Sequence, residues 1–161
     1  MNGYIRAYFA ISLSFIVALC LSMLPMPNFM YWLRPCWVTL LLIYWVVRTP
    51  NKVGVFSGFA VGISLDLLRG SLIGSMGFTL SIVAYFTTLL RFRLRQTNFG
   101  VQLFIILALV GIEQIISLLI QLLFNEIIIN FSYVIPTLVS VAVWPFLYIV
   151  LRAYQRNLKI A

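Results

Sequence analysis

The chain has 161 residues, of which 63% are hydrophobic and only 9% are charged, and its mean hydropathy is +1.10. Soluble domains carry about 25% charged residues, so this composition excludes a water-soluble protein and predicts one all-α, polytopic membrane domain over residues 1–161. The net charge of +8 does not indicate nucleic acid binding, because the 11 basic residues are scattered between apolar runs and form no continuous basic face.

Six apolar runs predict six transmembrane helices. The first run, 8–24, resembles a signal peptide in length but has no small-residue cleavage site after it, so we expect it to remain as a span. The second run, 35–47, covers only about 20 Å of a bilayer core about 30 Å thick; either 29–33 adds a helical turn or the span leans on its neighbours. The other four spans are expected over residues 53–68, 72–90, 100–124 and 134–151.

The segment before the second run is rich in proline and aromatic residues. Tyr31, Trp32 and Trp37 carry the amphipathic rings that are typical of the headgroup level of a bilayer. Pro35 suits the first turn of a helix, where its missing N–H group would have no partner in any case.

Basic residues gather on one side of the predicted spans. Six spans place both termini on the same side, and that side carries nine of the 11 basic residues. The two basic residues on the other side are Arg34 and Arg69. The positive-inside rule therefore predicts that both termini are cytoplasmic.

The third run carries small residues at intervals of four, and one acid, Asp66, fills a gap in the series. In a bilayer, this spacing indicates close helix packing, because residues four apart share one helical face. The pattern leaves open whether the packing helix belongs to this chain or to a partner. The glycines of this series are Gly54, Gly58, Gly62, Gly70 and Gly74.

Asp66 lies about 20 Å from the predicted cytoplasmic edge, where a charge has to be paired or reached by water. Arg69, three residues later on the same face, is the expected near partner, and Arg34 is the alternative. Two roles stay open for this acid. It either packs and caps the end of a close helix pair, or it anchors a partner's helix or a conformational switch.

Glu113 lies near the middle of the fifth run, with no basic residue in that run and with Gln114 and Ser117 nearby. Such an acid is either protonated or paired with a group on another helix. A proton relay between Glu113 and Asp66 is a further alternative. The absence of histidine argues against it, because the relay would consist of two acids alone. Glu126, the third acid, is expected in a solvated outer loop.

The usual signatures of enzymes and cofactor sites are missing from the sequence. The chain has no histidine, and Cys20 and Cys36 lack the spacing of metal ligands. We expect both cysteines to act as small apolar side chains; a disulfide between them requires that both lie near an oxidising outer surface. No catalytic residue, metal or cofactor is therefore predicted.

The sixth run contains the pair Trp144-Pro145. Proline inside a helix removes one hydrogen bond, so the pair predicts a structural kink. A docking notch for a partner is the alternative.

Three motifs, taken in order, resemble the MreD family of rod-shape-determining membrane proteins. They are Arg34-Pro35-Cys36-Trp37 before an apolar run ending in Tyr44-Trp45, the series Gly58-Phe59-x-x-Gly62-x-x-x-Asp66-Leu67-x-x-Gly70-x-x-x-Gly74, and Trp144-Pro145 before a basic tail. The resemblance extends over essentially the whole chain. It implies a fold like that of the six-helix substrate-binding subunits of energy-coupling-factor vitamin transporters. A shared fold does not imply that the chain shares their function. The family pattern has an aspartate where this chain has Glu113.

The resemblance implies a non-enzymatic component of the bacterial elongation machinery in the inner membrane. Such a protein binds MreC, is linked indirectly to MreB, RodA and the elongation penicillin-binding transpeptidase, and directs lateral peptidoglycan synthesis so that rod shape is maintained. The alternative is a small-molecule-binding membrane subunit of a transporter, which requires a polar cavity between helices. A packed interior with a groove for lipid or a partner favours the assembly protein.

Overall fold

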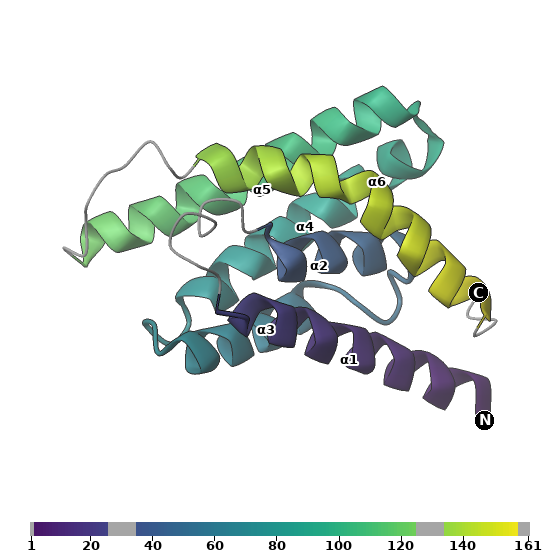
Figure 1. The fold of residues 1–161 in the computed structure, drawn as a ribbon, viewed down its shortest axis with the longest axis horizontal. Helices are drawn as coiled ribbons and strands as arrows, with labels where there is room; N and C mark the ends of the chain where they lie inside the picture. Colours follow the sequence, from purple (N-terminus) through teal and green to yellow (C-terminus); the bar gives the residue numbers. More distant parts are fainter. Residues whose placement is uncertain (1, 26–34, 125–133, 158–161) are drawn as a thin grey trace.

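A computed structural model describes residues 2–25, 35–124 and 134–157 of the chain, and these ranges contain six α-helices (Figure 1). Three segments are long and apolar enough to cross a membrane, namely Ser75–Gln96, Phe99–Leu123 and Ile135–Arg156, while Ala7–Met23 and Trp37–Arg48 are shorter apolar helices. The expected all-helical architecture is thus observed, with three helices that have the length and composition of membrane spans. The helices are α1 (Asn2–Met23), α2 (Trp37–Arg48), α3 (Val55–Arg69), α4 (Ser75–Gln96), α5 (Phe99–Leu123) and α6 (Val134–Asn157).

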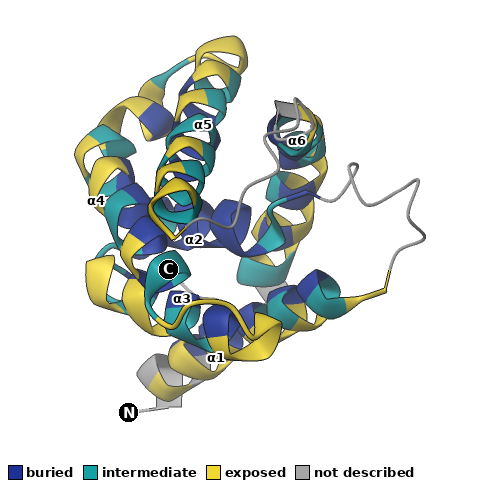
Figure 2. Ribbon diagram, turned by 90° about the vertical axis from the view of Figure 1, so that its left-hand side faces the viewer, coloured by how far each residue is buried: buried dark blue, intermediate teal, exposed yellow. Residues whose placement is uncertain are grey.

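Helix α2 is the centre of the bundle (Figure 2). Every residue from Val38 to Val47 is buried, so this helix has no solvent- or lipid-facing side. A helix that is hydrophobic all round has to be enclosed, and here α1, α4 and α6 contact it. Of the two alternatives for the short second run, the structure shows a helix that is supported by the neighbouring helices. Residues 29–33, which the sequence offered as an extension, lie outside the described residues.

Polar side chains fix α2 to the two helices beside it. Trp45 donates a 2.9 Å hydrogen bond from Nε1 to the Ser14 hydroxyl on α1. The Tyr44 hydroxyl donates to Gln155 Oε1 on α6 at 3.0 Å, and Arg48 donates to the Tyr148 hydroxyl at 2.7 Å. Buried aromatic residues with a polar atom usually find such a partner, so these bonds help to set how α1 and α6 lie against α2.

Two helices continue past the predicted ends of their spans into basic segments. Helix α4 extends to Gln96 and α6 extends to Asn157, whereas the apolar runs predicted ends at 90 and 151. Arginines in a last turn interact favourably with the negative end of the helix dipole, and their long side chains reach water from a helical backbone. The prediction of a basic loop over 91–98 is therefore wrong in extent, since only Thr97 and Asn98 separate α4 from α5.

Helix α6 changes direction along its length, and Pro145 lies inside it (Figure 1). This agrees with the predicted kink, because proline removes one hydrogen bond from the helix. Trp144 is 2% exposed, and its ring lies 6.2 Å from that of Tyr148, centroid to centroid. The indole is therefore enclosed by this chain, which speaks against the alternative of a surface notch formed by this residue.

Candidate functional site

The glycine face of α3 packs against α4 of the same chain. A Cβ atom placed on Gly62 would lie 2.4 Å from the Cα atom of Gly77, and one on Gly58 would lie 3.0 Å from the carbonyl oxygen of Leu80. Backbone atoms of a helix do not move aside, so the two helices approach this closely only because position 62 has no side chain. The sequence left open which helix packs here, and the structure places α4 at this face.

The other three glycines of the series have different roles. A Cβ atom on Gly54, Gly70 or Gly74 would meet no atom within 4 Å. Gly70 and Gly74 have φ values of 64° and 100°, in the left-handed region that favours glycine, and they form the turn between α3 and α4. The prediction of one continuous packing face through all five glycines is wrong, because the four-residue spacing runs on after α3 has ended.

Gly77, which supplies the closest backbone approach, was missed by the sequence reasoning. It lies on α4, where its own Cβ position is 3.1 Å from the Ile63 side chain and 3.3 Å from that of Phe59. Gly77 and Ser81 form a pair of small residues four apart, which is the signal that identifies such a face.

Asp66 is completely buried, and its carboxylate binds the beginning of α4. The Oδ2 atom accepts hydrogen bonds from the backbone N–H groups of Gly74 and Met76, at 2.9 Å and 3.0 Å. The Oδ1 atom accepts hydrogen bonds from the hydroxyl groups of Ser71 and Ser75, at 2.9 Å and 3.1 Å. The first N–H groups of a helix have no partner within it and carry partial positive charge. The carboxylate from α3 supplies both the missing acceptors and the opposite charge.

Within the described residues, Asp66 forms no ion pair with an arginine. Arg69, the expected near partner, is exposed, and Arg34, the alternative, lies outside the described residues. The turn and the helix N-terminus take the place of a cation, because their N–H and hydroxyl groups supply the donors that the two carboxylate oxygens require. The expected pairing with Arg69 is therefore wrong.

Glu113 lies apart from Asp66 and faces α2. It is 7% exposed, its carboxyl group lies beside the Thr39 hydroxyl and the Cys36 thiol, and the positive charge of Arg69 acts on it. Its Oε2 atom is buried without a hydrogen-bond partner. Among the described residues, no hydrogen bond joins Glu113 to Asp66, so the two acids do not form a proton relay in this structure.

Cys36, which directly precedes α2, connects the beginning of α2 to α5 and α6. Its backbone N–H group donates to the Ser140 hydroxyl on α6 at 2.8 Å, and its sulfur lies 3.5 Å from Gln114 Nε2 on α5. Both Cys20 and Cys36 are free, so the alternative of a disulfide between them is not realised.

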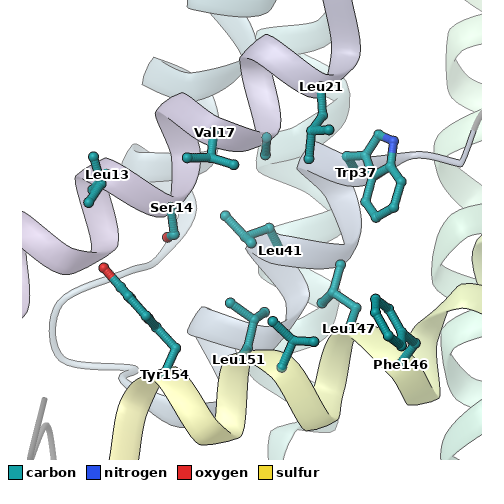
Figure 3. Close-up of a pocket in the computed structure, with 12 residues that line it drawn as sticks. Leu13, Ser14, Val17, Leu21, Trp37, Leu41, Phe146, Leu147, Leu151 and Tyr154 are labelled. Atoms are coloured by element: carbon teal, nitrogen blue, oxygen red, sulfur yellow. The ribbon is translucent and has the colours of Figure 1, made fainter. Parts of the chain in front are cut away.

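An apolar groove of about 370 Å³ lies between α1 and α6, with α2 as its floor (Figure 3). Leu13 and Val17 come from α1, whereas Phe146 and Val150 come from α6. Trp37, a predicted partner-binding residue, lines one end of the groove on α2. Val17, Phe146 and Val150 are 51%, 67% and 49% exposed, so nothing in the described chain covers this groove.

The predicted site residues are thus divided among four places. Gly58, Gly62, Asp66 and Gly74 meet where α3 packs on α4. Glu113 belongs to the cluster around Cys36, Trp37 lines the groove, and the Trp144 side chain is buried on α6. Pro35 is buried at the approach to α2.

Comparison with known proteins gives the same family over nearly the whole chain. A family model described as rod shape-determining protein MreD matches residues 4–156. The chain is 27% identical over 157 residues to a protein of Haemophilus influenzae named Rod shape-determining protein MreD, and the alignment covers 98% of this chain and 97% of that protein. No solved structure matches the chain. The match includes the α3–α4 pair and the α1–α6 groove and confirms the resemblance seen in the motifs: the chain belongs to the MreD family of rod shape-determining proteins.

Proposed function

We propose that this protein is a non-enzymatic assembly subunit of the bacterial elongation complex, and that the groove between α1 and α6 binds the transmembrane helix of MreC. Membership of a family described as rod shape-determining supports a role in cell shape. The observation that carries the partner assignment is the uncovered apolar groove on a protein whose small-residue face is already occupied by its own α4.

The groove has the chemistry that a transmembrane helix requires. Its lining is apolar apart from a few side chains such as Ser14, whose hydroxyl is already engaged by Trp45 and by the Ile11 carbonyl. Ser14 and Ala18 are small residues four apart on α1, and both line the groove. They let α1 lie close to α2, which forms the floor, and an amphipathic or apolar helix can lay one stripe of side chains into such a groove.

The proposal includes the topology. All six helices cross the inner membrane, and both termini lie in the cytoplasm, as the distribution of basic residues predicts. Helix α2, at about 18 Å, is shorter than the bilayer core. It tolerates this because it is enclosed by protein, where backbone groups near its ends are satisfied without lipid contact. We also propose that the fold is like that of the six-helix substrate-binding subunits of energy-coupling-factor transporters, and comparison with an experimental structure tests this likeness.

Through MreC, the protein is linked to MreB, RodA and the elongation penicillin-binding transpeptidase, and so to lateral peptidoglycan synthesis. The alternative, a small-molecule-binding subunit of a transporter, needs a polar cavity for its ligand. The α1–α6 groove is apolar, and the polar cavity at the Arg48 end of α2, of about 180 Å³, is smaller than the range of about 300–1,000 Å³ typical of small-molecule sites, which supports the assembly function over this alternative. Depletion of the protein in its host is expected to turn rods into spheres, and retention of rod shape would count against any role in the elongation complex.

A cysteine crosslinking scan tests the groove directly. In a background with Cys20→Ser and Cys36→Ser, single cysteines at Val17 and Val150 are paired with cysteines along the transmembrane helix of MreC. The neighbouring positions Ile16 and Ile149 are matched controls, since they are 55% and 67% exposed but do not line the groove.

We expect disulfide crosslinks from the two groove positions and none from the two controls. Crosslinks of equal yield from all four positions would show that MreC does not select the groove. Crosslinks from the controls alone would place MreC on another face of α1 and α6.

A further inference from the structure

A second cavity, of about 180 Å³, lies at the opposite end of α2 from Cys36. It is formed where α2 ends, where α4 turns into α5, and where α6 passes beside them. Its polar lining residues are Arg48, Arg95, Thr97 and Gln102, together with the aromatic residues Tyr44, Trp144 and Tyr148. Because α4 and α5 are long enough to span a bilayer, the short turn between them lies at a membrane surface. The cavity is therefore at the level of lipid headgroups.

The cavity carries positive charge that no described carboxylate neutralises. Arg48 donates to the neutral Tyr148 hydroxyl and lies 5.6 Å from the centroid of the Tyr148 ring. Arg95, also in the lining, is exposed. The two acids in the described ranges, Asp66 and Glu113, lie elsewhere and do not line the cavity. A guanidinium group has five N–H donors in a planar arrangement that suits carboxylates and phosphates, so two of them around one cavity favour an anion.

A buried donor without a partner gives a second, independent indication. The Trp144 side chain lines the cavity and is 2% exposed, and its Nε1–H group has no hydrogen-bond partner. An indole nitrogen only donates, and buried indole N–H groups normally find an acceptor. The Tyr148 hydroxyl accepts from Arg48 and still has its own proton to donate. An oxygen-rich anion in the cavity supplies an acceptor for the Tyr148 proton, and binding at this site requires that an oxygen of the anion also reaches the indole N–H group.

We propose that this cavity binds the phosphate group of an anionic membrane lipid. The position at headgroup level selects a lipid, because its acyl chains can continue into the bilayer along exposed apolar side chains of α5 such as Phe104, which is 70% exposed. Basic cavities between transmembrane helices at the cytoplasmic surface are typical sites for lipid phosphates. The volume is below the range of about 300–1,000 Å³ of sites for drug-sized ligands, and it suits a headgroup better than a folded peptide segment. This site does not depend on MreC binding.

The test uses the purified full-length protein in a neutral detergent, with phosphatidylglycerol, phosphatidylcholine or inorganic phosphate added. Native mass spectrometry counts the lipids bound, and the midpoint of thermal unfolding reports their apparent dissociation constants. We expect phosphatidylglycerol to raise the midpoint, and added salt to weaken this effect by screening. Phosphatidylcholine, whose phosphate is neutralised by choline, is expected to bind about ten-fold more weakly.

The variants separate the cavity from general surface charge. Arg48→Gln and Arg95→Gln are each expected to weaken phosphatidylglycerol binding about five-fold. Trp144→Phe, which keeps an aromatic ring and removes the N–H group, is expected to weaken it about ten-fold. Arg93→Gln is the matched control on α4, since Arg93 is exposed and does not line the cavity; it is expected to bind as the unaltered protein does. Arg48→Lys, which keeps the charge, separates loss of the ligand from loss of folding.

Equal weakening in Arg93→Gln would overturn the assignment to this cavity, as would unchanged binding in Arg95→Gln and Trp144→Phe. Binding of inorganic phosphate as tight as that of phosphatidylglycerol, with the same dependence on the variants, would overturn the lipid in favour of a soluble anion. Loss of MreC co-purification in Arg48→Gln with an unchanged lipid dissociation constant would overturn it in favour of an acidic segment of a partner.

Discussion

The α3–α4 pair and the α1–α6 groove differ in one respect: α4 covers the glycine face of α3, whereas no described helix covers the groove. In the pair, Gly62 meets Gly77 backbone to backbone, and Asp66 caps the helix that it packs against. Beside the groove, Ser14 and Ala18 of α1 pack against α2, where Ser14 accepts from Trp45 and Ala18 is 2% exposed, whereas Val17 and Val150 remain about half exposed. Small residues at a spacing of four thus mark a helix-packing face on both α3 and α1, and in each case the helix received, α4 or α2, belongs to this chain.

The connection between the helices explains why one face is closed. Only residues 70–74 separate α3 from α4, so the second helix is always within reach of the first, and its effective concentration is high. Helices α1 and α6 lie at opposite ends of the sequence. Both are held by α2, and Tyr154 of α6 also packs against Ala7 and Ala10 of α1. The following substitutions test this contrast, from the largest expected loss of stability to the smallest.

Gly62→Leu is expected to prevent α3 and α4 from packing, because even a Cβ atom at this position would lie 2.4 Å from the Gly77 backbone. Overpacking of a core costs about 1–3 kcal/mol and occasionally more, and this contact is with backbone, so we expect about 3 kcal/mol or complete loss of folded protein. The unfolding midpoint in detergent and the yield of monodisperse protein measure the effect. Gly54→Leu is the matched control, since Gly54 has no atom near its Cβ position. Similar behaviour of the two variants would contradict close packing at Gly62.

Asp66→Ala is expected to lower the free energy of unfolding by about 2–3 kcal/mol, because it leaves the first N–H groups of α4 without an acceptor in a buried site. Asp66→Asn keeps one acceptor oxygen and is expected to cost about half as much. The same unfolding measurement checks both variants. Because the carboxylate is used within this chain, any weakening of MreC binding by these variants is expected to follow the loss of stability. Lost binding at full stability would show that Asp66 contacts the partner after all.

Trp45→Phe removes the hydrogen bond from α2 to Ser14 at the edge of the groove. We expect a loss of about 1 kcal/mol, which is typical for one intramolecular hydrogen bond. A double-mutant cycle with Ser14→Ala isolates the pair, and a coupling energy near zero would show that this bond does not hold α1 on α2.

Val17→Trp fills the groove from its α1 side. Because Val17 is 51% exposed, we expect the free energy of unfolding to change by about 0.5 kcal/mol or less. Co-purification of MreC is nevertheless expected to fall sharply, since the indole occupies the space of the partner helix. Ile16→Trp, on the neighbouring outward position, is the control and is expected to change neither quantity. Normal binding of MreC by Val17→Trp would contradict the proposal that the groove receives the helix of MreC.

The sequence predicted the helices better than their ends. Apolar runs correctly indicated six helical segments, but α4 and α6 continue through Arg91–Arg95 and Arg152, since polar composition does not end a helix at a membrane surface. At the site, the glycine spacing identified α3 as a packing helix, but it carried on into Gly70 and Gly74, which serve the turn. A four-residue period contains no signal for where the helix stops, so the pattern alone could not separate packing glycines from turn glycines.

The amino-acid sequence by itself determined the membrane class, the helical architecture and the need to pair a lone acid, because hydropathy and the cost of a buried charge are properties of composition and spacing. Tertiary structure decided how that need is met. The partner of Asp66 is the N-terminus of α4 and not Arg69, because folding brings a helix end with free N–H groups within 3 Å of the carboxylate. It also decided which faces remain open: α4, the next helix along the chain, occupies the glycine face of α3, whereas the groove between α1 and α6 stays uncovered by the described residues.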